Sequence, residues 1–202
     1  MHDSLKYMSF DPIYRQHHHH QLTFSMWYGF DENFMLPLSH DEVVHMKGSL
    51  ITKMPGSYEQ KFENLKTYLG YMWTHPGKKL LFMGGELAQF NEWHYESELD
   101  WNLLHFPMHS RFKDYVKALN CFYRSNSPLW EIENSWDGFS WLQASDYESN
   151  VVVYMRKNRR GDELICVVNF SAEERKAYRF EVSRKGPYKV IFQSDLEIFG
   201  GK

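Results

Sequence analysis

A four-residue polar cluster, residues 39–42, follows directly after the apolar run at residues 34–38 and contains His40, Asp41 and Glu42. A carboxylate placed there can act as an acid, a base or an electrostatic stabiliser of a reacting group. Such clusters at the carboxyl ends of buried strands are where α/β barrels carry their chemistry. Asp after a strand is also typical of a helix N-cap, so Asp41 alone leaves both interpretations open.

Two further groups of side chains have the types that bind metal ions. Four consecutive histidines occupy residues 17–20, but adjacent histidines point in different directions on a helix, and a shared metal ion would need i, i+4 spacing or an extended run. We expect a solvated loop there, not a metal site or a tag. Cys121 and Cys166 lack metal-type spacing and are predicted to be buried free thiols. No metal and no cofactor is expected.

The elements around the cluster predict one strand–helix–strand unit. The runs at residues 34–38 and 79–83 are apolar without alternation, which suits strands buried on both faces. Between them, Ser57 and Gln60 form a capping-box pattern that opens a helix, with an apolar face of Phe62, Leu65, Leu69 and Met72. A crossover of this length implies parallel strands. Glu86, after the second run, carries the same ambiguity as Asp41, as does Asp100.

The flanking segments show two other patterns. The first thirty residues look helical, with a helix start at Asp11-Pro12 and an apolar stripe of Leu22, Met26 and Phe30, with Trp27 beside it. Another helix is predicted over residues 110–125. Beyond a boundary near residues 126–133 the period changes to two, which predicts an antiparallel sheet, most simply a sandwich. Its five strand candidates are residues 139–142, 151–155, 164–168, 177–180 and 188–192.

The combination resembles a known family. The string from Phe34 to His45, with Lys53-Met54-Pro55-Gly56 after it, resembles the seventh-strand region of bacterial glycogen-branching enzymes, which are members of the α-amylase superfamily. Further matching stretches are residues 76–86, Glu92-Trp93, Leu99-Asp100-Trp101, Asn169-Phe170 and residues 194–201. The resemblance covers essentially the whole chain. It implies an α/β plus all-β fold: residues 1–127 form the last two strand–helix units of a TIM-type (β/α)8 barrel, and residues 128–202 form an incomplete antiparallel β-sandwich.

The resemblance also implies roles for individual residues. Asp41 occupies the place of the carboxylate that stabilises the transition state, and His40 that of a histidine bound to the same sugar. Glu42, Trp93, Asp100 and Trp101 are expected to bind substrate. The implied activity is a retaining transfer of an α-1,4-glucan segment to a 6-hydroxyl, which makes an α-1,6 branch in glycogen.

The chain departs from the family pattern at two positions and lacks two of the family's catalytic motifs. Met46 stands where the family has Gly, so the local backbone changes if that position has a positive φ, and Leu87 stands where Phe is usual. The nucleophile and the acid/base belong to motifs on earlier strands that we do not find. Both ends of the chain look cut, so we expect an inactive C-terminal portion that needs an upstream polypeptide carrying the rest of the barrel. A non-catalytic carbohydrate-binding remnant, using Trp93, Trp101 or Trp136, and a functionless gene fragment remain alternatives.

The composition of the chain restricts the kinds of partner that we expect it to bind. A hydrophobic content of 43% and a charged content of 24% indicate a globular chain, and the net charge of −3 gives no reason to expect nucleic acid or an anionic membrane. No apolar run is long enough to span a bilayer, so a soluble cytoplasmic protein acting on α-1,4-glucan or glycogen is expected. Because two strands cannot close a barrel, residues 34–83 are expected to be less ordered in isolation than residues 135–193.

Overall fold

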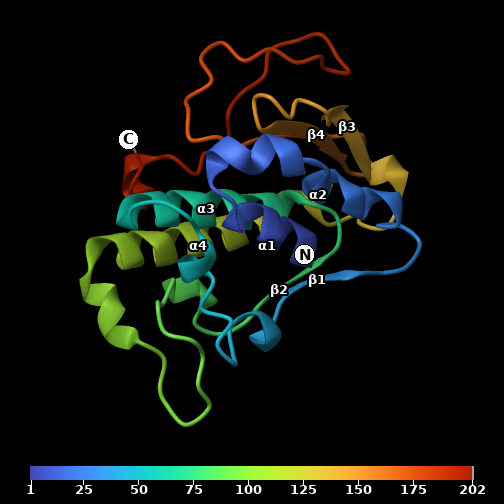
Figure 1. Ribbon diagram of the computed structural model, residues 1–202. Coiled ribbons are helices and arrows are strands. Elements are labelled where there is room, and N and C mark those ends of the chain that lie inside the picture. The colour runs from blue at the N-terminus through green and yellow to red at the C-terminus, as the bar shows by residue number, and fades with distance from the viewer. Residues whose placement is uncertain (202) are drawn as a thin grey trace.

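The helix α3 (Tyr58–Thr74) crosses the middle of the molecule and separates two small sheets. The computed structural model describes residues 1–201, and Figure 1 shows α3 with α4 (Pro107–Ser125) beside it and the N-terminal helices packed nearby. The parallel pair β1 (Met35–Leu38) and β2 (Lys78–Leu81) lies on one side of α3. The antiparallel sheet of β3 (Phe139–Gln143), β4 (Val151–Lys157) and β5 (Glu163–Asn169) lies on the other.

The first thirty residues form short helical pieces instead of one helix. These are α1 (His2–Ser9), the 3₁₀ segment η1 (Pro12–His18), α2 (His20–Thr23) and the 3₁₀ segment η2 (Phe24–Trp27). The helix start at Asp11-Pro12 is confirmed, because the Asp11 carboxylate accepts the N–H of Ile13 at 3.1 Å. Leu22 and Met26 are buried as predicted. Trp27, which the sequence places beside this stripe, is 84% exposed at the end of η2.

The solvated loop predicted for residues 17–20 is wrong. These residues lie at the end of η1 and the start of α2, and His19 is buried. The imidazole Nε2 of His19 lies 2.9 Å from the carbonyl of Ala144, which joins the N-terminal region to the turn before β4. The run of histidines therefore includes one packing residue that composition alone could not distinguish from its exposed neighbours.

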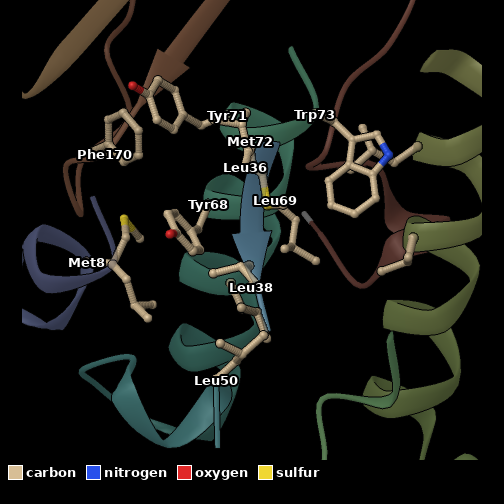
Figure 2. Close-up of a cluster of buried hydrophobic side chains, with 14 of the residues drawn as sticks. Met8, Leu36, Leu38, Leu50, Tyr68, Leu69, Tyr71, Met72, Trp73 and Phe170 are labelled. Carbon is tan, nitrogen blue, oxygen red and sulfur yellow. The ribbon is translucent and has the colours of Figure 1, made fainter. Parts of the chain in front are cut away.

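The strand–helix–strand unit is confirmed in its topology. β1 and β2 pair in parallel, with Leu38 opposite Leu81, and the Ser57–Gln60 capping box is present at the start of α3. The apolar face of α3 is fully buried and packs near β1, as Figure 2 shows for Leu69 and Leu38. Burial of β1 on both faces is wrong: Leu36 and Leu38 are buried, whereas Met35 is 53% exposed, because only one face of this pair meets α3.

Three of the five predicted antiparallel strands are confirmed. β3, β4 and β5 pair in order, and β4 is buried along nearly its whole length. The strands predicted at residues 177–180 and 188–192 are wrong, and the predicted sandwich is accordingly a single sheet in the described residues. The physical reason is exposure: Val190 and Ile191 are 76% and 57% exposed, so their alternating pattern buries no apolar face here. The sheet packs against α3.

Two fully buried arginines fasten the sheet to the helices. The Arg156 guanidinium on β4 donates to the backbone carbonyls of Gly138, Thr74, Leu129 and Ile132. Arg15 of η1 does the same for Phe10, Met8 and Phe170, and also donates to the Asn64 side chain. The apolar core, which runs from Leu5 to Phe199, is one continuous cluster on both sides of residue 127. Cys166 is buried within it as predicted, whereas Cys121 is exposed on α4, so its predicted burial is wrong.

Candidate functional site

The carboxyl end of β1 turns at once into the short 3₁₀ segment η3 (His40–Glu42). Ser39 caps this segment: its hydroxyl accepts the Asp41 N–H at 3.2 Å, and the Glu42 carboxylate accepts both the Ser39 N–H and the Ser39 hydroxyl proton. This capping box fixes the direction of the three side chains. Glu42 is turned inward and buried, whereas the side chains of His40 and Asp41 are 56% and 66% exposed.

His40 and Asp41 form a pair at this strand end. The His40 Nε2 lies 3.4 Å from the Asp41 Oδ1, and the His40 ring lies 5.9 Å from the ring of Phe82, the residue after β2. A carboxylate next to an imidazole can bind sugar hydroxyls as an acceptor while the imidazole donates. The outward-facing pair is therefore the chemically available part of the predicted cluster.

An apolar hollow lies between the carboxyl ends of β1 and β2. It is lined by Leu38, Val43, Phe82 and Trp93, among others. Trp93 packs edge-on against Phe82 with ring centroids 5.1 Å apart, and its backbone N–H donates to Val43 at 3.0 Å. The structure thus brings Trp93 to the strand ends that also carry His40 and Asp41.

The other predicted site residues are placed differently. The Glu42 carboxylate accepts the Ser39 N–H and lies 3.4 Å from the Nε2 of His2. Glu42 therefore faces the core and not the hollow. Asp100 accepts a hydrogen bond from Asn91 at 2.9 Å, and Asn91 lines the hollow. Trp101 is 51% exposed at the start of η6 (Trp101–His105) and makes no ring contact with another described residue.

The loop after η3 contains residues that the sequence did not single out as functional. His45 and Met46 both have positive φ values, 57° and 63°, so Met46 occupies a backbone conformation that favours glycine. The Glu92 carboxylate accepts the N–H groups of Met46 and Gly48, and these bonds, Gly48 first, lower the pKa of the Glu92 carboxyl. Glu92 appeared in the sequence only as a family match, and this pairing of a loop with a distant carboxylate has no local signal.

Comparison with known proteins places the chain. The model of the alpha amylase C-terminal all-beta domain matches residues 141–202. The 1,4-alpha-glucan branching enzyme of Halothermothrix orenii is 55% identical over all 202 residues, and that of Aquifex aeolicus is 53% identical over the same length. An enzyme of the same name from Rhizobium johnstonii is 49% identical over 201 residues.

This chain is a relative of the 1,4-alpha-glucan branching enzymes. The resemblance seen in the sequence is confirmed along its full length. The chain spans 32% of the length of the first two of these branching enzymes and 27% of the third. Within residues 1–201, no helix is both long and apolar enough to cross a bilayer, and no three His, Cys, Asp or Glu side chains are grouped to hold a metal ion.

Proposed function

We propose that this chain is part of a 1,4-α-glucan branching enzyme and that Asp41 is its transition-state-stabilising carboxylate. The observation that carries the proposal is the full-length match to branching enzymes, combined with an Asp41 side chain held outward at the end of β1. A carboxylate there opposes the positive charge that develops on a sugar ring as its glycosidic bond breaks. His40 donates to a hydroxyl of the same sugar, and the Trp93 region supplies an apolar wall.

A retaining transfer needs two more carboxylates, a nucleophile and an acid/base. In the family that this chain resembles, the nucleophile stands in an Arg-x-Asp motif on an earlier strand. The Arg160-Gly161-Asp162 triplet has this form but does not supply the nucleophile, because it lies in the turn between β4 and β5 and the Asp162 carboxylate accepts from Asn158. Enzymes of this kind lower the barrier by about 8–23 kcal/mol. One preorganised group contributes about 3–4 kcal/mol. The isolated chain is therefore proposed to be inactive, and an upstream polypeptide supplies the missing carboxylates.

The same proposal covers the incomplete parallel sheet. β1 and β2 are adjacent parallel strands joined through α3, which is the arrangement of neighbouring strands in a (β/α)8 barrel. Residues 1–127 are proposed to complete such a barrel with the upstream part, and residues 128–202 to form the attached β-domain. Glycogen or another α-1,4-glucan is the proposed substrate, and the cytoplasm the proposed location.

A chimera tests the proposal. The matching third of the Halothermothrix orenii enzyme is replaced by this chain, and α-1,6 branches formed on amylose are counted. We expect branching by the chimera and a fall of at least about 100-fold on Asp41→Asn, because a neutral amide no longer opposes the developing charge. Asp114→Asn on the exposed face of α4 is the matched control. A folded chimera that branches equally well with Asp41→Asn would contradict the role of Asp41.

A specific observation also favours glucan binding without catalysis. Trp136 is 54% exposed and packs edge-on against Phe30. Two residues before it in the chain, the Asn134 carboxamide donates to the Asn33 side chain at 2.8 Å. An exposed indole is suited to stacking on a sugar ring. Retardation of the isolated chain in an amylose gel, lost on Trp136→Ala but not on Trp130→Ala, would support this second function. No branching by the chimera, together with no retardation of the isolated chain, would leave a functionless gene product.

A further inference from the structure

The side chain of Lys53 ends inside the loop that follows Asp41. Its ammonium group donates to the backbone carbonyls of Glu42 at 2.7 Å, Lys47 at 2.7 Å and Gly48 at 2.5 Å, and the carbonyl of Ser49 lies at 3.5 Å. An ammonium group has three N–H donors, so the three nearest oxygen atoms satisfy all of them. The loop is thus wrapped around one positive charge supplied by the next segment of the chain.

Glu92 holds the opposite side of the same loop. Its two carboxylate oxygens accept the N–H groups of Met46 and Gly48, so Gly48 is held through its N–H by Glu92 and through its carbonyl by Lys53. Hydrogen bonds to a charged group are stronger than neutral ones. The Lys53 ammonium binds backbone carbonyls and the Glu92 carboxylate binds backbone N–H groups. Together they stabilise the one backbone conformation of the loop that presents both sets of groups.

That conformation is a strained one. His45 and Met46 are consecutive non-glycine residues with positive φ values, a conformation that side chains of L-amino acids disfavour. Such backbone persists only where the surroundings determine it, and it gathers at functional sites. Both side chains are exposed, so packing of His45 and Met46 does not supply the compensation, whereas Lys53 and Glu92 do.

The loop is connected directly to the backbone of the predicted site. Lys47 donates from its ammonium to the Asp41 carbonyl at 2.8 Å, and the Glu42 carbonyl is one of the three bound by Lys53. The carbonyls of the two peptide groups that follow the Asp41 side chain are therefore tied to the loop. A shift of the loop by one ångström would be passed on to the Asp41 carboxylate.

We propose that Lys53 and Glu92 are positioning residues that hold the strained loop of residues 43–49 and thereby fix the Asp41 carboxylate for glucan transfer. The transfer itself rests on the function proposed above, whereas the holding of the loop does not. Neither residue touches the substrate. Their effect passes through the backbone of Met46 and Gly48 to Lys47 and Asp41.

Amide hydrogen exchange in the 202-residue chain tests the holding of the loop without any activity. Lys53→Ala and Glu92→Gln are each expected to speed exchange of the Met46 and Gly48 N–H groups at least about tenfold, while exchange in α3 stays unchanged. Lys61→Ala is the matched control, since Lys61 also donates to one backbone carbonyl, that of Met54, but outside this loop. If Lys53→Ala loosens the whole chain, the result for Glu92→Gln decides whether the loop is held as proposed. Glu92→Gln removes a partly exposed charge without opening a cavity. Unchanged exchange at Met46 and Gly48 in Glu92→Gln overturns the proposal.

Chemical rescue tests the link to Asp41 in the chimera described above. Lys53→Gly is expected to lower kcat at least about tenfold with little change in KM, and ethylammonium is expected to restore much of it by placing an N–H-bearing cation in the vacated space. Tetramethylammonium has the charge but no N–H donor and should not rescue. Full kcat in Lys53→Gly, while Asp41→Asn is inactive, overturns the positioning role but leaves the proposed function standing. Full activity in Asp41→Asn would sink the proposed function, with the exchange result unaffected.

Discussion

The guanidinium of Arg156 donates to the carbonyl of Thr74 at 2.7 Å and so joins the middle strand of the antiparallel sheet to the last residue of α3. Thr74 also contacts the sheet through its hydroxyl, which lies 2.5 Å from the Tyr154 hydroxyl. Both contacts lie next to the turn that leads into β2. The turn that leads into β2, the strand next to β1, is thus fastened to the sheet on the other side of α3.

Replacing Arg156 by Met should lower the free energy of unfolding by about 2–4 kcal/mol. The substitution removes the donor of four carbonyl groups, of which those of Gly138 and Leu129 are buried and those of Thr74 and Ile132 partly buried. Unsatisfied buried acceptors cost about 1–3 kcal/mol each before the structure relaxes. Urea denaturation followed by tryptophan fluorescence measures the change. Arg159→Met, in the exposed turn after β4, is the control and should change stability by less than about 0.5 kcal/mol. Equal effects of the two variants would disprove the fastening role of Arg156.

Replacing Met46 by Gly should raise the free energy of unfolding by about 0.5–1 kcal/mol. The Met46 side chain is 94% exposed and its φ is 63°, so glycine removes backbone strain and loses little packing. The gain is less than the full strain because glycine also makes the unfolded chain more flexible. Urea denaturation is again the measurement. Met83→Gly, at an exposed position outside the positive-φ residues, should destabilise instead, and a loss of stability in Met46→Gly would contradict the strain assigned to this loop.

His75 should make the protein less stable in acid. Burial lowers the pKa of the His75 imidazole to about 3, whereas in the unfolded chain it is about 6.5. Between these values the unfolded state binds the proton and the folded state does not, so stability is retained above about pH 6.5 and falls as the pH drops toward 3. The slope due to this one group approaches about 1.4 kcal/mol per pH unit. Urea titrations from pH 7 to pH 4 should give a shallower dependence for His75→Gln, and an unchanged one for His105→Gln at an exposed position. Identical slopes for His75→Gln and the parent would show that His75 is not buried as a neutral group.

Hydrogen exchange should be slowest in α3 and fast in residues 177–192. Tyr68, Leu69 and Met72 are fully buried in α3, whereas residues 181–191 are exposed throughout. This reverses the sequence-based expectation that residues 34–83 are the less ordered part and residues 135–193 the better ordered part. Peptide-level exchange followed by mass spectrometry gives the comparison. Protection in residues 177–192 equal to that of β4 would restore the sequence-based expectation.

The parts of the fold that the sequence predicted are those with a strong local signal. The capping box at Ser57, the apolar face of α3 and the parallel crossover all follow from spacing along the chain. The strands predicted at residues 177–180 and 188–192 failed because alternation specifies a strand only where a partner and a buried face exist. The N-terminal helix was predicted less well, because the 3₁₀ segments η1 and η2 have a different period from the α-helix that was assumed.

The residues of the candidate site also fall into those with a local sequence signal and those without one. Asp41 and His40 could be found because a polar cluster ends an apolar strand, and the structure holds both outward. The burial of Glu42 could also have been predicted from local sequence, because Ser39 and Glu42 have the spacing of a capping box. The family resemblance implied substrate binding by Glu42 instead. Glu92 and Lys53 reach the loop from 44 and 5 residues beyond Gly48, and no periodic pattern encodes such contacts.

The continuous apolar cluster has a consequence for how this chain comes apart. Side chains from the N-terminal helices, α3, α4 and the antiparallel sheet share one interior, and both buried arginines cross between its parts. Neither the helical half nor the sheet half retains a closed interior without the other. We therefore expect melting to be a single cooperative transition, in which loss of the antiparallel sheet also unfolds the Asp41 loop.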